Sequence, residues 1–317
     1  MHINKILKSA LAAMLFMTLA VSAQAADMLK PYVLASSGPG DVAKVTDEVK
    51  AKLTAAGFEI VGSYAPFAGS NILVVTNDDL KKAAASSERG GYLAPMRVTV
   101  TKQYGNGKGA AFSPADAQIQ VAFTNPVYWA AAYRVSADVS AVKAKLAATL
   151  GSKEEYGSFY DYKDGITADK LKDYHYTVMM EYFDDPSDLG SHDSHEEAVK
   201  AVEAGLASHA GGTSKVYRID LPGKEETVFG VALSSGCSGD ATTMKAVDMG
   251  PLHSTGYAPY EILVSGKDVQ ALYARFRIAI AYLGLPMMAN PTGGTFMNIM
   301  CAPGAIEDAL MAAAGKK

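Results

Sequence analysis

The chain has 317 residues, of which 49% are hydrophobic and 20% charged, and its formal net charge at pH 7 is -4. This length accommodates two domains of ordinary size, and the composition is typical of a globular protein with a substantial core. The negative net charge argues against nucleic acid or an anionic membrane surface as a partner.

The N-terminus has the pattern of a secretory signal peptide. Lys5 and Lys8 precede an apolar run over residues 10–20, and Ala23-Gln24-Ala25 follows it. These features predict cleavage after Ala25, because the apolar run is shorter than the ~20 residues that a membrane span needs. An uncleaved anchor helix is the alternative. We therefore expect a periplasmic protein with residues 1–25 as its signal peptide and no transmembrane segment after cleavage.

The first predicted domain covers residues 26–150. Strands are expected at residues 30–35, 58–64, 71–76, 92–100 and 119–124, and helices at 41–56, 77–87 and 136–150. The last two strands flank a Gly-rich loop at residues 105–114. Strands that alternate with helices but include adjacent hairpins predict an α+β fold, with one antiparallel-rich sheet and helices packed on one face.

One stretch of this domain returns far downstream. Gly90-Gly91-Tyr92-Leu93-Ala94-Pro95 is followed by a β-rich run, and so is Ser254-Thr255-Gly256-Tyr257-Ala258-Pro259. Each copy predicts a Gly-Tyr turn with a proline at the start of a strand, where no ladder hydrogen bond is lost. A further strand that ends at a proline is expected after each copy, at residues 119–126 and 296–303. We interpret the pattern as two tandem related domains.

The second predicted domain covers residues 174–317, after a charged and aromatic linker at 151–173 that we expect to lie across a domain surface. Strands are expected at residues 174–183, 214–221 and 227–234, and helices at 196–210, 240–247 and 304–314. An apolar stripe with four-residue spacing predicts an inserted helix at 268–284, where the first copy has only its Gly-rich loop. This insertion leads us to expect the specific function near Tyr257 rather than near Tyr92.

The chain has two cysteines, Cys237 and Cys301, and both follow predicted strands of the second domain. In an oxidising compartment such a pair predicts a disulfide bond. Two buried thiols are the alternative.

Two short motifs carry a resemblance to a known family. Gly57-Phe58-Glu59-Ile60-Val61-Gly62 follows the first helix, and Asn125-Pro126 follows the last strand of the first domain. With this order of elements, residues 30–150 and, more weakly, 174–314 resemble the bacterial family called domain of unknown function 302. The resemblance implies an α+β domain with a dimer-like packing of two sheets, and it implies no activity or catalytic residues.

Two groups of residues are candidate metal ligands. His192, Asp193 and His195 are close enough in sequence to bind zinc or copper, although Asp and Ser before a helix are also ordinary caps. His253 is a candidate third imidazole. The second group is a set of thioethers and a thiol that suits Cu(I), although methionine more often fills a core. This set comprises Met287, Met288, Met297, Met300 and Cys301.

Catalysis has little support in the sequence. The segment at residues 234–239 is rich in small residues, but it does not match the nucleophile elbow that leads directly into a helix. A ligand cleft between the two sheets is better supported, because aromatic rings with a few polar groups are typical of such clefts. Packing in the core is the alternative role for these residues. The candidate ligand-binding residues are Tyr92, Asn125, Tyr128, Trp129 and Tyr257.

The sequence thus predicts a periplasmic, non-catalytic binding or assembly protein that needs no cofactor. A zinc- or copper-handling protein is the first alternative, and a hydrolase or redox enzyme is the second. The sequence does not identify the partner, whether it is a small molecule, a periplasmic protein or a second copy of the chain.

Overall fold

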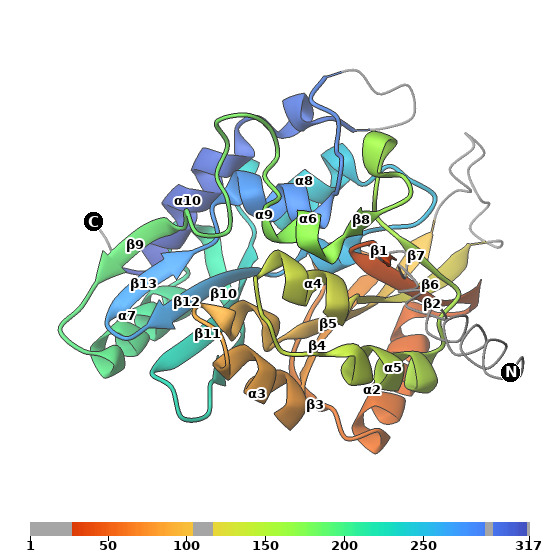
Figure 1. The fold of residues 1–317 in the computed structure, drawn as a ribbon, viewed down its shortest axis with the longest axis horizontal. Helices are drawn as coiled ribbons and strands as arrows, with labels where there is room; N and C mark the ends of the chain where they lie inside the picture. The colour runs from red at the N-terminus through yellow and green to blue at the C-terminus, as the bar shows by residue number, and fades with distance from the viewer. Residues whose placement is uncertain (1–26, 104–116, 289–293, 316–317) are drawn as a thin grey trace, which may run out of the picture.

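A computed structural model describes residues 27–103, 117–288 and 294–315 (Figure 1). The predicted signal peptide and the Gly-rich loop at 105–114 lie outside these residues. The fold is α+β, as predicted, and its two large sheets are wholly antiparallel. The first sheet has the order β3-β4-β5-β6-β2-β7. Its strands are β2 (Tyr32–Pro39), β3 (Glu59–Tyr64), β4 (Ser70–Thr76), β5 (Met96–Gln103), β6 (Gln118–Thr124) and β7 (Glu154–Tyr156).

The second sheet repeats this topology and lies to the left of the first in Figure 1. Its order is β10-β11-β12-β13-β9. The strands are β9 (Ser187–Ser191), β10 (Thr213–Asp220), β11 (Glu226–Leu233), β12 (Tyr260–Ser265) and β13 (Asp268–Ala271). Strands β5 and β12, which follow the two Gly-Tyr turns, occupy the same third place in their sheets. The repeated order is compatible with two tandem copies of one domain.

Each sheet is covered on its outer face by a pair of equivalent helices. In the first half these are α2 (Val42–Ala55) and α5 (Ser140–Leu150), and in the second half α7 (His195–Ala207) and α10 (Ala302–Ala313). Helix α2 begins where the Asp41 carboxylate accepts from the Lys44 amide, and it buries Val49 and Leu53. Helix α7 begins at an equivalent cap, Ser194, and buries Val199, Val202 and Leu206.

Four further helices form two equivalent pairs. Helix α3 (Asp78–Ala85) corresponds to α8 (Asp240–Val247), and α4 (Pro126–Ala132) to α9 (Ala274–Ala281). The Gly-Tyr turns form the 3-10 helices η1 (Gly90–Leu93) and η5 (Thr255–Tyr257). Each of these turns contacts the sheet of the opposite half, because η1 touches β11 and β12 while η5 touches β4, β5 and β6. The two halves therefore pack through reciprocal contacts.

The inner face of the first sheet is polar but buried. Along β5, Arg97, Thr99 and Thr101 alternate with Val98 and Val100, and all five side chains are buried. The valines face the helices, as expected for alternation along a strand. The polar side chains face the second half: the Arg97 guanidinium contacts the Pro259 carbonyl, and the Thr101 hydroxyl lies 2.8 Å from that of Thr255. The sheet edges also meet, because a Cβ on Gly62 would lie 2.5 Å from the Val216 carbonyl oxygen.

Three predicted elements of the second half were wrong. The inserted helix at 268–284 is instead β13 followed by α9, so the second half has the counterparts of β6 and α4 rather than an insertion. A tight turn at Gly266, whose φ is +55°, directs the chain into the hairpin, and the apolar spacing alone could not reveal it. The expected strand at 174–183 is irregular, and β9 takes its place in the sheet.

The expected final strand at 296–303 is the third error. This segment forms the 3-10 helix η6 (Phe296–Ile299) and then the start of α10. A capping box explains the difference, because the Thr295 amide and hydroxyl both donate to the Asn298 side chain and fix a helical turn.

The segment predicted as a linker, 151–173, contacts both halves, since its Phe159 amide donates to the Leu283 carbonyl of the second half at 2.8 Å. Its strand β7 pairs with β2 at the edge of the first sheet. Further along it forms η2 (Tyr160–Tyr162), β8 (Ile166–Thr167) and α6 (Ala168–Lys172), and β8 pairs with β1 (Met28–Leu29). Within the described ranges no helix is long and apolar enough to cross a membrane.

The predicted disulfide bond is present between Cys237 and Cys301. Cys237 lies in the 3-10 helix η4 (Gly236–Ser238), immediately before α8, and Cys301 is the N-cap of α10. The bond therefore joins the starts of two helices of the second half.

Candidate functional site

The connection between α8 and η5, residues 248–254, lies against the polar inner face of the first sheet. The Gln120 amide of β6 accepts from the His253 backbone N–H at 2.9 Å and donates to the His253 carbonyl at 2.7 Å. The Tyr156 hydroxyl donates to the same carbonyl at 2.9 Å, and the Gln103 amide donates to the Pro251 carbonyl at 2.7 Å. Side chains of three strands of the first half thus fix the backbone of this connection.

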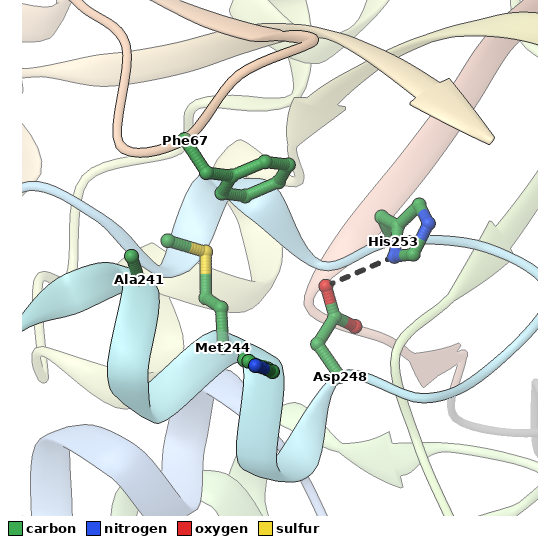
Figure 2. Close-up of a pocket in the computed structure, with 6 residues that line it drawn as sticks. Phe67, Ala241, Met244, Asp248 and His253 are labelled. Atoms are coloured by element: carbon green, nitrogen blue, oxygen red, sulfur yellow. Dashed lines mark ion pairs between the residues drawn. The ribbon is translucent and has the colours of Figure 1, made fainter. Parts of the chain in front are cut away.

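A pocket of about 290 Å³ opens where this connection meets the first half. Figure 2 shows Phe67 and Met244 on one side of the pocket and the pair formed by Asp248 and His253 on the other. Phe67 comes from the β3–β4 loop of the first half, whereas the other lining residues belong to α8 and the connection that follows it. The lining residues are Phe67, Ala241, Met244, Lys245, Asp248 and His253.

The charged side of the pocket is built around the Asp248 carboxylate. Its two oxygens each accept from the Ser254 backbone N–H at 2.9 Å, and Oδ2 lies 3.4 Å from Nδ1 of His253. Burial of the His253 imidazole opposes its protonation, but the hydrogen bond and charge of Asp248 outweigh this effect and raise the pKa of His253. The His253 imidazole, whose pKa is raised, and the Lys245 ammonium form the basic side of the pocket next to its apolar walls.

The other end of α8 is also tied to the first half. The Asp240 carboxyl accepts from the Tyr64 hydroxyl of β3 at 2.9 Å and from the Leu233 amide at 3.0 Å. Asp240 is fully buried, and this burial raises the pKa of its carboxyl from 3.8 to about 7. Helix α8, which supplies three pocket residues, is therefore held at its first residue and just beyond its last.

The five residues predicted to bind a ligand are all completely buried, and none of them lines this pocket. The Trp129 indole donates to the Pro31 carbonyl, the Tyr128 hydroxyl to the Ile280 carbonyl, and the Asn125 amide to the Lys30 carbonyl. These side chains pack in the core, which was the alternative reading of the sequence. The rings of Tyr92 and Tyr257 are in contact with those of other buried tyrosines.

The centre of the core between the sheets is ionic. The Glu261 carboxylate forms ion pairs with both Arg97 and Arg277, and all three side chains are buried. Both guanidinium groups lie over the Trp129 ring, at 5.9 Å and 5.1 Å from its centroid. Arg97 and Glu261 occupy equivalent positions, two residues after the proline of each repeated stretch. The ion pair therefore joins corresponding points of the two halves.

The predicted metal ligands His192, Asp193 and His195 lie at the start of α7. Both ring nitrogens of His195 have protein partners, the Gly266 carbonyl at 2.9 Å and the Thr227 hydroxyl at 3.2 Å. A metal ion would have to displace one of these contacts. Over the described parts of the chain, no three His, Cys, Asp or Glu residues are grouped as a metal site. His253 lies where the second half packs against the first, and its imidazole pairs with the Asp248 carboxylate. Zinc or copper binding at residues 192–195 stays a prediction.

The sequence pointed to the neighbourhood of this pocket but missed most of its residues. His253 was noted only as a third metal ligand, and Phe67, Met244, Lys245 and Asp248 were not selected. One available signal was the length of the connection before each Gly-Tyr turn, which is residues 86–89 in the first half and 248–254 in the second. Extra residues in one copy of a repeat are typical of a segment that carries function.

Comparisons of the chain with protein-family models, with curated proteins and with solved structures each found no match. The resemblance to the domain of unknown function 302 family therefore stays a prediction.

Proposed function

We propose that this protein binds a small molecule with an apolar body and one anionic group, and that the ligand occupies the pocket between α8 and the β3–β4 loop. The observation that carries the proposal is the composition of this pocket, in which Phe67, Ala241 and Met244 stand beside Lys245 and His253. Apolar walls with a few polar groups are typical of ligand sites. The volume of 290 Å³ is near the lower end of the usual range of roughly 300–1,000 Å³.

The position of the pocket supports the same function. It lies between two halves that are packed through a buried ionic core, so its walls are held on rigid elements and little reorganisation is needed when a ligand enters. The negative charge of Asp248 is already matched by the Ser254 amide and by His253, whereas Lys245 is exposed at the pocket. The net electrostatic preference of the pocket is therefore for an anionic group.

Binding without chemistry is the reading that the pocket favours. An aspartate that orients a histidine occurs in nucleophilic enzymes, but a third group, the nucleophile, is needed within reach of the histidine. Among the described residues that line the pocket, none is a serine, threonine or cysteine. Periplasmic location, which rests on the predicted signal peptide, is part of this proposal.

A fluorescence titration with 8-anilinonaphthalene-1-sulfonate, an apolar molecule with one sulfonate, tests the proposal. We expect saturable binding to the native protein. Ala241→Phe should abolish it, because the half-buried Ala241 side chain faces the pocket and a phenyl ring would fill it. Ala204→Phe, which adds the same ring to the exposed surface of α7, is the matched control. Unchanged binding in Ala241→Phe would contradict the proposal.

A second variant separates the charge from the shape of the pocket. Lys245→Ala should weaken binding of the sulfonate, while a neutral probe of similar shape should bind the variant and the native protein equally. Equal affinity of both proteins for the sulfonate would show that the cationic side has no role. Native mass spectrometry of the protein from its own cells would then identify the natural ligand.

A further inference from the structure

Methionine dominates the exposed apolar surface of this protein. Among the described residues, nine large hydrophobic side chains are exposed, and seven of them are methionines. None of the nine is leucine, isoleucine or phenylalanine. These residues would provide apolar contact as well as methionine does, or better. The property that sets methionine apart from leucine is its polarisable thioether sulfur.

Four of these methionines belong to one surface at the start of the C-terminal helix. The exposed fractions are 36% for Met287, 69% for Met288, 47% for Met297 and 59% for Met300. Two backbone hydrogen bonds hold the segments together, from the Phe296 amide to the Pro286 carbonyl at 2.9 Å and from the Met297 amide to the Met287 carbonyl at 3.1 Å. Met287 and Met297 are therefore neighbours in space although they are separated in sequence.

The same turn brings Met300 to the face that carries Met297. Met297 lies in the 3-10 helix η6 and Met300 is its C-cap. Residues three apart in a 3-10 helix are eclipsed, so both side chains leave the same side of the turn. Three thioethers, each on a side chain with three rotatable bonds, are thus anchored within reach of one another.

The backbone beneath these side chains is fixed at both ends. The capping box of Thr295 and Asn298 closes the start of η6, and Cys301, next to Met300, is bonded to Cys237. A ligand set on a fixed backbone binds a metal more tightly, because less conformational freedom is lost when the ion binds.

We infer that Met287, Met297 and Met300 form a binding site for Cu(I), a soft monovalent cation for which thioether is a preferred ligand. The ion coordinates to the sulfur lone pairs, and no bond of the protein is broken and no electron is transferred. Cys301 is excluded as a ligand because it is part of the disulfide bond. This site is distinct from the ligand pocket and from the histidines at residues 192–195.

Independence from pH follows from the chemistry of these ligands. Histidine, cysteine and carboxylate ligands must lose a proton to bind a metal, so their affinity falls in acid. A thioether carries no proton to lose. The affinity for Cu(I) should therefore be nearly the same at mildly acidic and neutral pH, which a site that includes His192 or His195 could not achieve.

Competition for Cu(I) against the chromogenic chelator bicinchoninate, without oxygen and with ascorbate as reductant, tests the inference on the mature disulfide-bonded protein. We expect one equivalent of Cu(I) to be retained at both acidic and neutral pH. Replacing Met297 and Met300 together by leucine, which keeps the apolar surface, should lower the affinity by more than about tenfold, since even outer-shell changes cost this much at metal sites.

Met28→Leu is the matched control, because Met28 is 49% exposed on β1, which pairs with β8 rather than with the segments that carry Met287, Met297 and Met300. Its affinity for Cu(I) should equal that of the native protein. Three results would overturn the inference: no retained Cu(I), retention that the Met297→Leu and Met300→Leu changes leave intact, or retention that disappears in acid.

Discussion

The two halves of the molecule correspond in their sheets and helices. The connections that lead into their Gly-Tyr turns differ. Both connections contact the opposite half: the Ser87 carbonyl accepts from the Lys224 ammonium at 2.6 Å, and the His253 amide donates to the Gln120 side chain at 2.9 Å. Residues 86–89 form the shorter connection, in which the Arg89 guanidinium donates to the Phe183 carbonyl at 3.4 Å, and none of these four residues lines the pocket of Phe67 and Met244. The connection formed by residues 248–254 is longer. It carries Asp248 and His253 and forms one side of the pocket.

This difference indicates how a repeated scaffold can acquire a site. Contacts that hold the halves together are present in both copies, whereas the residues that line the pocket come mostly from the longer connection and from α8. The first half contributes the wall at Phe67 and the polar strand residues that hold the connection in place. The comparison therefore separates a symmetric, stabilising part of the junction from an asymmetric part that forms the pocket, to which we assign the proposed ligand.

The largest expected effect concerns the symmetric part. Glu261→Gln removes the carboxylate shared by Arg97 and Arg277 and leaves two guanidinium groups buried without a counter-charge. Breaking a buried ion pair in this way typically costs on the order of 3–5 kcal/mol, which urea unfolding would measure. Asp169→Asn is the control, because the ion pair of Asp169 with Lys172 is exposed to solvent. Equal stability of the two variants would contradict the central role of Glu261.

The disulfide bond is a feature of the second half alone, and its loss should have the next largest effect. Replacing Cys237 and Cys301 by alanine removes a cross-link between residues separated by 64 positions. Loss of such a bond typically lowers the free energy of unfolding by about 2–5 kcal/mol. Urea unfolding checks this, and the native protein treated with dithiothreitol should behave like the variant. A urea midpoint of unfolding that does not change when the disulfide bond is reduced would contradict the prediction.

Asp240 and Asp78 provide a matched comparison, since they are the first residues of the equivalent helices α8 and α3. The buried Asp240 carboxyl has a folded pKa of about 7 against 3.8 in the unfolded chain, so the native state binds more protons between these values. Stability should therefore decrease as pH rises from about 4 to 7. Asp240→Asn should flatten this part of the profile of melting temperature against pH, whereas Asp78→Asn, at an exposed position, should not. Identical profiles for both variants would count against the buried acid.

The smallest expected effect is the pH dependence of ligand binding. Because the pKa of His253 is raised above its ordinary value of 6.5, the imidazole keeps its positive charge to a higher pH than a free imidazole does and loses this charge as pH rises through the folded pKa. Affinity for an anionic probe should fall over the same interval, and His253→Gln should bind more weakly at low pH and without this dependence. The contribution of the Asp248–His253 pair to the free energy of unfolding should change in the same direction. It should be present in acid and lost as pH rises. A pH-dependent affinity that persists in His253→Gln would assign the effect to another group.

Much of the fold could be predicted from local patterns. Period-two and four-residue spacings located most strands and helices, and the repeated Gly-Tyr stretch marked equivalent places in both sheets. The errors arose where a local device overrides periodicity: the hairpin turn at Gly266 and the capping box at Thr295. The alternation of Arg97, Thr99 and Thr101 on β5 would indicate a solvent-facing surface in a single domain. Only the packing of the second half explains why these residues are buried.

The candidate site was harder to predict, for a related reason. Aromatic residues such as Trp129 and Tyr257 are typical of ligand clefts and of cores alike, and the sequence does not show which side of a sheet another domain covers. The pocket joins Phe67 to Met244 and His253, which lie far apart in the chain and meet only through the packing of the halves. No spacing rule connects such residues.

The most direct test of the central claim is nuclear magnetic resonance of the protein labelled in its methionine methyl groups and titrated with 8-anilinonaphthalene-1-sulfonate. The Met244 methyl group lies in the pocket, whereas Met96 is buried in the first sheet and Met179 is exposed elsewhere. We expect the Met244 resonance to move with saturation and the other two to stay in place. Saturable binding that leaves Met244 unmoved would contradict the assignment of this pocket as the ligand site.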